Sequence, residues 1–334
     1  MQQQFSSSPD TLSQHYATLV HALCNISEVY YLQGRLDDAL TVLKAGAQLT
    51  AASAVQPQDQ VKLLLQYGKV LIRRFFLTSL DVDTMLATVE RAQQVAEAAH
   101  DERGIVNALA LLGQAHYYIG LNAALYAAGD LYGAQEHSSR SLTYFQQALE
   151  RGEALQDTRV MSEALFYIGL VHERRRQNEQ AQPYYTRSLQ IAEQHNHKLE
   201  TSYAARHLSG IALENGDLEQ ALNYALKSLH LREEIGFRSA LPHSHLLVSD
   251  VYMAQKDLAN AHFHAQQAYA LAEDQKQKDG IIFSLLTLGD IHLAQKETEQ
   301  ARENFEQALA LAQEVQLTYA ISMASKRLKD LAKQ

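Results

Sequence analysis

A forty-residue internal repeat dominates the C-terminal half of this sequence. Four segments align without gaps, and each ends on an alanine at the same position: Ala181, Ala221, Ala261 and Ala301. Equal spacing with matched flanking residues is typical of repeat architectures, in which each unit packs only on its neighbours. Within each unit, apolar residues recur at helical spacing in two halves that a short polar break separates. The sequence therefore predicts an all-α chain built from stacked helix pairs.

A small residue recurs in the middle of the first predicted helix of each regular unit. These residues are Gly169, Ser209, Ser249 and Gly289. A glycine inside a helix costs about 1 kcal/mol relative to alanine. Its recurrence therefore predicts that the second helix of the unit approaches closely there, with its alanine facing the small residue.

The repeat resembles the tetratricopeptide repeat, whose pattern is W-x2-L-G-x2-Y followed by A-x3-F. Here the pattern reads Leu165, Ile168, Gly169, His172, Ala181 and Tyr185, and again Leu285, Leu288, Gly289, His292, Ala301 and Phe305. The resemblance covers residues 11–316 and implies a right-handed α-solenoid of about seven antiparallel helix pairs, followed by a capping helix. The forty-residue period is similar to that of repeats in bacterial signalling and regulatory proteins and in kinesin light chains.

The domain organisation follows from where the repeat is regular. We expect a disordered, Ser/Gln-rich tail at 1–10 and a single superhelical domain at 11–334. Irregular repeats occupy 11–156, regular repeats 157–316 and a capping helix 317–333. Repeat three carries an insertion at about 120–135, which is either a lid over the groove or an irregular surface loop, because long loops in compact arrays are often functional.

Composition excludes several classes of function. The formal net charge of −9 argues against sequence-independent nucleic-acid binding, which needs a basic face. No apolar run is long enough to span a bilayer, and the polar start lacks the core of a signal peptide. The single cysteine, Cys24, excludes an internal disulfide framework, so we expect a cytoplasmic protein.

The sequence predicts neither a cofactor nor a metal. It has no Gly-rich phosphate loop, and His172-Glu173 is not followed by the second histidine of a zinc helix. The pairs His243/His245 and His262/His264 are two residues apart, which places the members of each pair on different faces of a helix.

The resemblance to tetratricopeptide repeats implies that the first helix of each pair lines a concave groove. Counting from the Gly/Ser slot places an apolar, aromatic wall in repeats five to seven and a polar centre in repeats four to six, where Gly210 leaves room beside Arg206. Apolar pockets with a few convergent polar groups are the usual ligand sites. The candidate ligand- or partner-binding residues are Tyr117, Asn122, Glu163, Phe166, Tyr167, Glu173, Arg174, Tyr203, Arg206, His207, Gly210, His243, Leu246, Asp250, Met253 and Phe283.

The charged residues of the groove need not bind a ligand, because they can pair with one another, as Glu173 and Arg206 could. A second basic cluster in repeat two raises the same choice. It is either a clamp for the acidic end of a peptide or a solvated face, and the second reading is favoured. Its members are Lys62, Lys69, Arg73 and Arg74.

Three functions fit these features. The first is a protein–protein interaction module that binds a peptide or a partner helix in its groove. The second is the small-molecule effector-sensing domain of a bacterial regulator, which requires a pocket of small-ligand size. The third is an enzyme that uses Glu173, Arg206, His207 and Tyr203 for acid–base chemistry, although no motif orders these residues.

Overall fold

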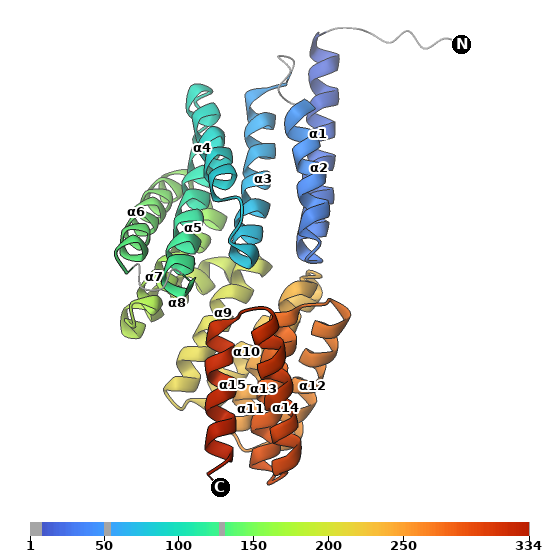
Figure 1. Cartoon of the computed structure of the whole chain (residues 1–334). Coiled ribbons are helices and arrows are strands. Elements are labelled where there is room, and N and C mark those ends of the chain that lie inside the picture. The colour runs from blue at the N-terminus through green and yellow to red at the C-terminus, as the bar shows by residue number, and fades with distance from the viewer. Residues whose placement is uncertain (1–8, 50–54, 127–130, 334) are drawn as a thin grey trace, which may run out of the picture. The chain divides into compact units, whose positions relative to one another are not determined.

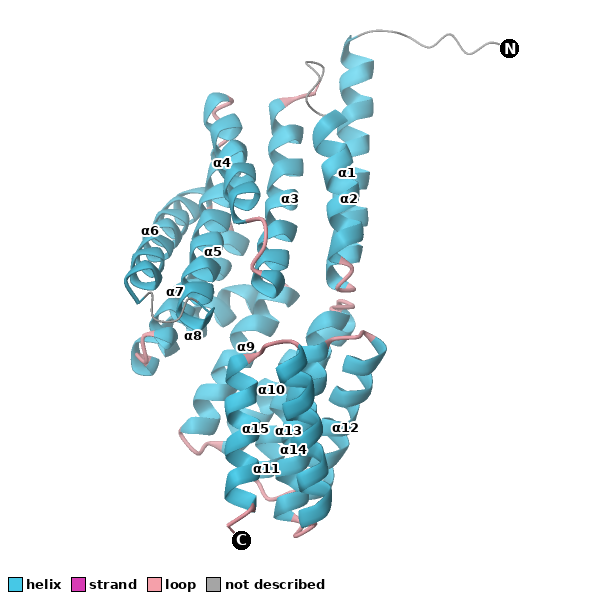
Figure 2. Cartoon of the chain, viewed as in Figure 1, coloured by secondary structure: helices cyan, strands magenta, loops and turns pink. Residues whose placement is uncertain are grey.

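The computed structural model describes residues 9–49, 55–126 and 131–333, and every regular element in these ranges is a helix (Figures 1 and 2). The predicted all-α class is therefore confirmed. Of the predicted tail, residues 1–8 lie outside the described ranges, and Pro9 already begins the first helix. None of the described helices is long and apolar enough to cross a membrane.

The helices divide between two compact units, 1–200 and 201–334. Unit 1 contains α1 (Pro9–Leu32), α2 (Leu36–Leu49), α3 (Pro57–Thr78), α4 (Val82–Ala98), α5 (Glu102–Tyr126), α6 (Leu131–Leu155), α7 (Thr158–Arg174), α8 (Asn178–Gln194) and the first turn of α9 (Lys198–Glu214). Unit 2 contains the rest of α9, α10 (Leu218–Glu234), the 3-10 turn η1 (Arg238–Ala240), α11 (Leu241–Ala254), α12 (Leu258–Asp274), α13 (Lys278–Ala294), α14 (Thr298–Glu314) and α15 (Thr318–Leu331). The single domain expected over 11–334 stays a prediction.

Within each unit, helices that follow one another in the chain pack together, as α1 on α2, α5 on α6, α7 on α8, α11 on α12 and α13 on α14 do, which is the arrangement of a helix-pair solenoid. The first helices of successive pairs also pack together: α1 on α3, α3 on α5 and α5 on α7 in unit 1, and α11 on α13 and α13 on α15 in unit 2. In each unit the first helices therefore form a layer of their own, here called the inner layer. Residues that sequence counting assigns to the groove lie on these helices.

Most of the turns between helices are built on one left-handed residue. Positive φ angles recur every twenty residues at Gln156, Arg176, Asn196, Gly216, Gly236, Lys256, Lys276, Lys296 and Gln316. The next N–H then reaches back to a carbonyl of the preceding helix, as Asp217 does to Ala212 at 2.9 Å. Asp217 also caps the following helix, because its side chain accepts a hydrogen bond from the N–H of Gln220.

The small residue of each first helix meets its partner helix in two different ways. In the glycine repeats the atoms nearest to this residue belong to an aromatic ring of the second helix. A Cβ at Gly169 would lie 2.7 Å from Tyr185, and a Cβ at Gly289 would lie 2.3 Å from Phe305. The ring four residues beyond the alanine fills the space over the glycine, so the close approach of the second helix is present, while the facing alanine stays a prediction for these repeats.

The serine repeats meet the prediction. Ser209 Oγ donates to the carbonyl of Ala221 and Ser249 Oγ to that of Ala261, each at 2.8 Å. In the serine repeats, a buried alanine occupies the sequence position that the aromatic residue has in the glycine repeats. In the repeat of Ser249 this alanine is Ala265. The small residue of the first helix and the facing residue of the second helix are thus complementary in volume. A glycine is paired with an aromatic residue, and a serine is paired with an alanine.

The insertion in repeat three lengthens two helices. Both α5 and α6 have 25 residues, against 17 in each of α7 and α8. The described part of 120–135 is therefore helical, which corrects the irregular loop, while 127–130 lie outside the described residues and the lid stays a prediction. Leucine and alanine at 121–125 are strong helix formers, so the added residues extend the pair.

We predict that the volume pairing can be exchanged between repeats. Gly289→Ser alone should destabilise unit 2 by about 1–3 kcal/mol, because Phe305 occupies the space that the new side chain needs. Phe305→Ala alone should cost about 3–5 kcal/mol by leaving a cavity. The double variant reproduces the Ser249/Ala265 pairing, so chemical denaturation should show it to be more stable than the sum of the two single effects predicts, by about 1 kcal/mol or more. Strict additivity would contradict the pairing.

A second prediction concerns the left-handed turn residues. Lys276 has φ 55°, a conformation that costs an L-residue about 1–2 kcal/mol and glycine almost nothing. Lys276→Gly should therefore stabilise the chain by about 0.5–1 kcal/mol after the entropy of the unfolded glycine is deducted. The control Ala270→Gly lies inside α12 and should destabilise by about 1 kcal/mol. Thermal melts that show the same sign for both variants would refute the argument.

Candidate functional site

Charged side chains on the inner layer of unit 1 pair across neighbouring helices. Lys69 on α3 donates to both carboxylate oxygens of Glu28 on α1 at 2.9 Å, and Gln66 donates to the same carboxylate at 2.9 Å. Burial alone would raise the pKa of Glu28, but Lys69 and Gln66 lower it below its ordinary value. Lys69 also lies over the ring of Tyr31. This pairing joins α1 to α3 on the groove side.

Glu163 on α7 is the most perturbed acid of this layer. Its Oε1 accepts from Gln114 Nε2 on α5 at 2.8 Å, and Gln114 in turn accepts from the hydroxyl of Tyr167 at 3.2 Å. Burial and the nearby carboxylate of Glu200 raise the pKa of Glu163 to about 7. The partner of Glu200 is Arg159, whose Nε lies 2.8 Å from Glu200 Oε1. Glu163 is therefore an acid that changes charge near neutral pH.

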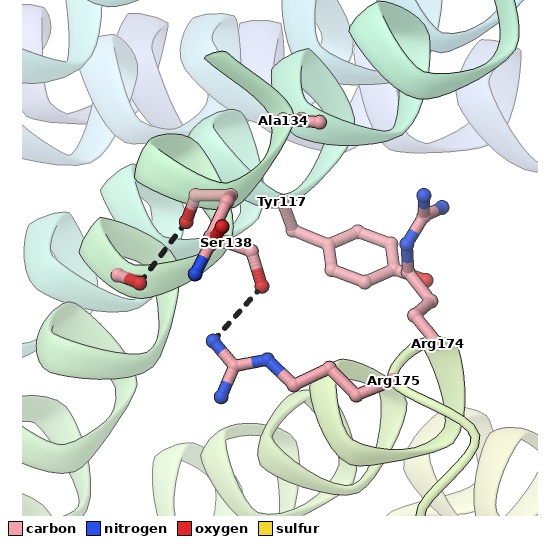
Figure 3. A pocket seen from close by; sticks show the side chains of 8 residues that line it. Tyr117, Ala134, Ser138, Arg174 and Arg175 are labelled. Atoms are coloured by element: carbon pink, nitrogen blue, oxygen red, sulfur yellow. Dashed lines mark hydrogen bonds between the residues drawn. The ribbon is translucent and has the colours of Figure 1, made fainter. Parts of the chain in front are cut away.

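An open pocket of about 560 Å³ lies where α5, α6 and the end of α7 meet (Figure 3). Arg175 Nη2 donates to Ser138 Oγ at 3.2 Å, and the Arg174 guanidinium lies 5.5 Å from the ring centre of Tyr117. The predicted residues Tyr117 and Arg174 thus meet at one site. The lining residues are Tyr117, Gly120, Ala134, Gln135, Ser138, Ser139, Arg174 and Arg175.

Aromatic packing surrounds the inner end of this pocket. Tyr117 meets Tyr118 edge to face at 5.2 Å, and the ring of Tyr167 stacks on Phe145 at 4.9 Å. Burial raises the pKa of the Tyr117 hydroxyl above its ordinary value. Phe166 and Tyr167 are both buried, so these two predicted residues offer little surface to a ligand.

Two other predicted residues of unit 1 have local partners. Asn122 Nδ2 donates to Ser79 Oγ at the connection between α3 and α4. Glu173 Oε2 accepts from the hydroxyl of Tyr185 at 2.7 Å, which ties the end of α7 to α8. The predicted pair of Glu173 with Arg206 has one member in each unit and stays a prediction.

In unit 2, the predicted residues on α9 form a partly exposed polar patch. The Arg206 guanidinium lies 3.2 Å from Nε2 of His207, and Tyr203 packs edge to face on Phe237 at 6.3 Å. A Cβ on Gly210 would meet nothing within 4 Å. The open space that the sequence indicated one turn beyond Arg206 is therefore present.

Predicted residues on α11 and α13 also come together in unit 2. His243 and Phe283 occupy the same position of successive repeats, and their rings meet at 6.2 Å. His243 Nε2 lies 3.7 Å from Asp279. Met253 and Phe283 are partly exposed, whereas Leu246 is buried in the core.

Asp250 on α11 faces a salt bridge between the next two inner-layer helices. Arg327 on α15 binds Asp290 on α13 in bidentate geometry, with Nη2–Oδ2 at 2.6 Å and Nε–Oδ1 at 2.8 Å. The Asp250 carboxylate is exposed at the surface, yet surrounding protein atoms and the charge of Asp290 raise its pKa to about 7.

The basic cluster of repeat two makes protein contacts. Lys62 Nζ lies 2.9 Å from His21 Nδ1, and Lys69 pairs with Glu28. Arg74 pairs with Asp81 at 3.2 Å, and Arg73 lies over the ring of Phe76. This cluster is therefore engaged within unit 1. Across the described ranges, no three His, Cys, Asp or Glu side chains are placed to hold a metal ion.

Comparison with known proteins places the chain among repeat proteins. Residues 242–314 match the family model described as tetratricopeptide repeat, and no curated protein matches the sequence. A Signal Transduction ATPase with Numerous Domains from Pyrococcus horikoshii, with a tetratricopeptide repeat sensor, superimposes with a TM-score of 0.59 at 15% identity over 95% of this chain. This chain covers 46% of that protein, less than half of its length.

Two further solved structures share the fold. BtubC from P. vanneervenii superimposes with a TM-score of 0.55 at 15% identity, covering 70% of this chain and 92% of that protein. The Rap conjugation gene regulator of plasmid pLS20, solved in complex with the Phr* peptide, gives a TM-score of 0.54 at 13% identity, with 94% and 89% covered. At these identities the likeness shows the fold.

Several residues of these sites are not among the candidate residues that the sequence predicts. Gln114, Gln135, Ser138, Ser139 and Arg175 were absent from the candidate residues, although the run Arg174–Arg176 at the end of a predicted helix was visible in the sequence. Arg327, in the predicted capping helix, is likewise not among the candidates, although it pairs with Asp290 of the preceding repeat.

We predict that Glu163 makes stability depend on pH. Because the folded state raises this pKa from 4.5 to about 7, it retains the proton to higher pH than the unfolded chain does. The free energy of unfolding then falls as pH rises from about 4.5 to about 7 and levels off above. Glu163→Gln keeps the Gln114 contact and should be the more stable protein at pH 8, by on the order of 1–2 kcal/mol, but not at pH 4.

The control for this measurement is Glu150→Gln, which removes the same charge from an exposed position on α6. Its effect should remain within about 0.5 kcal/mol at both pH values. Denaturation curves in which Glu163→Gln gains nothing between pH 4 and pH 8 would show that the carboxyl is not perturbed.

Proposed function

We propose, from the premise that this chain carries tetratricopeptide repeats, that it is a protein-interaction module whose inner layer binds a peptide or a partner helix. Binding of this kind places apolar anchors of an extended or helical segment against the side chains of a groove. The observation that carries the proposal is the partly exposed pair of His243 and Phe283 on α11 and α13.

The area around this pair has the composition of an interaction surface. Met253 on α11 and Leu293 on α13 are also partly exposed, and all four side chains lie on inner-layer helices. Aromatic residues and methionine are enriched at protein interfaces, because they provide large contact areas. This inner-layer surface of unit 2 would supply affinity for apolar side chains.

The charged side chains of unit 2 would fix the position and orientation of a bound segment along the inner-layer surface. Asp290 is neutralised by Arg327, whereas Asp250 stands beside that pair with its own carboxylate exposed. Charged groups at the edge of an apolar surface fix orientation and suppress wrong partners more than they add affinity. A bound segment with a basic side chain opposite Asp250 is therefore favoured.

Two structural neighbours support the proposal in general terms. The Rap regulator was solved with a bound peptide, and the Pyrococcus protein uses its tetratricopeptide repeats as a sensor. Both are similar to this chain in fold. The Rap regulator supports peptide binding as a use of such an array, and the Pyrococcus protein supports a sensing use.

A second candidate function is small-molecule sensing. The pocket of about 560 Å³ in unit 1 falls within the range of about 300–1,000 Å³ that is usual for small-ligand sites. Its polar lining distinguishes it from the apolar surface of unit 2. Retention of a metabolite rather than a peptide by the purified chain would favour this function.

The test is a peptide selection followed by matched variants. Peptides selected from a displayed library should bind the wild-type chain saturably in fluorescence polarisation. Phe283→Ala should weaken this binding about tenfold or more, as expected for an interface anchor. Phe263→Ala removes the same ring from α12, where it is 53% exposed, and should change the affinity less than about twofold.

Phe283 also packs on the core of unit 2, so loss of folding must be separated from loss of contact. Phe283→Leu keeps most of the apolar volume and should retain folding by circular dichroism together with part of the affinity. Equal losses in Phe263→Ala and Phe283→Ala, or a library that yields no saturable binder, would refute the proposed function.

A further inference from the structure

The pocket between α5, α6 and the end of α7 contains two arginines without an acidic partner. Neither Arg174 nor Arg175 forms an ion pair with any residue in the part of the chain that the structure describes. Some other arginines of the same unit do: Arg140 pairs with Glu136, and Arg187 pairs with Glu153, each at 2.6 Å. We propose that this pocket is an oxyanion site that takes a carboxylate or a phosphate group.

The side chains that line the pocket carry the positive charge that an anionic ligand needs. None of its eight residues is acidic, and its polar side chains are two guanidinium groups, the hydroxyls of Tyr117, Ser138 and Ser139, and the amide of Gln135. A guanidinium presents its N–H groups as a planar fork that matches two oxygens of a carboxylate or phosphate. The lining therefore combines positive charge with hydroxyl and amide groups and offers no competing anion.

Both guanidinium groups are positioned before any ligand binds. Arg175 Nη2 donates to Ser138 Oγ, which leaves the hydroxyl proton of Ser138 available to an acceptor in the pocket (Figure 3). Arg174 lies over the Tyr117 ring, which is itself buried. An arginine that is already oriented loses less side-chain entropy on binding.

The shape of the pocket follows from the lengthened helix pair. A Cβ on Gly120 would lie 3.1 Å from the carbonyl of Ala134 and 3.2 Å from Cβ of His137, so α5 and α6 approach closely there. This contact lies in the part of α5 and α6 that the insertion adds. It sets the distance between two walls of the pocket.

The helix dipole is an alternative explanation for the arginines at the C-terminal end of α7. Cations at the C-terminal turn of a helix are stabilised by its partial negative charge, and Arg174 to Arg176 follow one another there. This effect acts on all three side chains alike. It does not explain why Arg174 and Arg175 line the pocket while Arg176, at φ 58°, does not.

The experiment uses inorganic phosphate and citrate as probes, with glycerol as an uncharged control, in calorimetric titrations of the full chain at low ionic strength. Saturable binding of at least one anion is expected. Arg175→Gln should weaken it about tenfold or more, as a charged hydrogen bond requires. Arg176→Gln removes the same charge one residue away and should change the affinity less than about twofold.

A second matched pair adds charge instead of removing it. Gln135→Glu places a carboxylate in the lining, whereas Gln146→Glu places one on an exposed turn of α6 outside the pocket. Only the first should abolish anion binding. The Nε–Hε resonance of Arg175 should also shift in the wild-type chain on titration, which locates the anion without any variant.

The two anions distinguish the possible sources of the ligand. Selective binding of phosphate would indicate a phosphorylated ligand, and selective binding of citrate a carboxylate ligand. Failure of both to bind, or equal effects of Arg175→Gln and Arg176→Gln, would overturn the proposal. None of these outcomes depends on peptide binding by unit 2, so the oxyanion site and the proposed function can fail separately.

Discussion

In the regular repeats, the contact between the small residue of a first helix and the second helix of the same pair sets the geometry of the unit. A glycine admits an aromatic ring at van der Waals contact, as Phe305 does over Gly289, and a serine binds the facing backbone instead. Both solutions bring the two helices to close packing without a cavity. Since each repeat contacts only its neighbours, this distance determines how the first helices stack and therefore which side chains reach the inner layer.

The repeat pattern predicted the class of fold and the helix pairs, because period and apolar spacing depend on local sequence. It did not predict the left-handed turn residues, since only Gly216 and Gly236 of that series are glycines and the rest are lysine, arginine, asparagine and glutamine. The αL conformation of these residues is imposed by the packing of the helices on either side. The insertion was misread for a related reason: residues 120–135 hold glycines and tyrosines that suggest a loop, whereas contacts with the paired helix keep the described part helical.

For the candidate site, counting positions along single helices found residues but not their partners. Glu163 was named, whereas Gln114, which holds it, lies 49 residues earlier and on another helix. Arg327 was missed as the partner of Asp290 because nothing local links the two residues. The pocket in unit 1 depends on the extra length of α5 and α6 in space. Its lining residues Gln135 and Ser138 have no counterpart in the family's groove positions, so no repeat-based rule could have selected them.

The structure separates charges that hold the repeats together from charges that remain available. Lys69 with Glu28, Arg159 with Glu200 and Arg327 with Asp290 each join neighbouring first helices, so replacing one partner would leave the other charge without its counter-ion. Such pairs explain much of the polarity of the inner layer without any ligand. Arg174 and Arg175 differ, because within the described ranges their contacts are a tyrosine ring and a serine hydroxyl. A pair of oriented cations in a pocket whose eight described lining residues include no acid retains its capacity for an anion. This distinction, rather than polarity alone, identifies where unit 1 is prepared to bind.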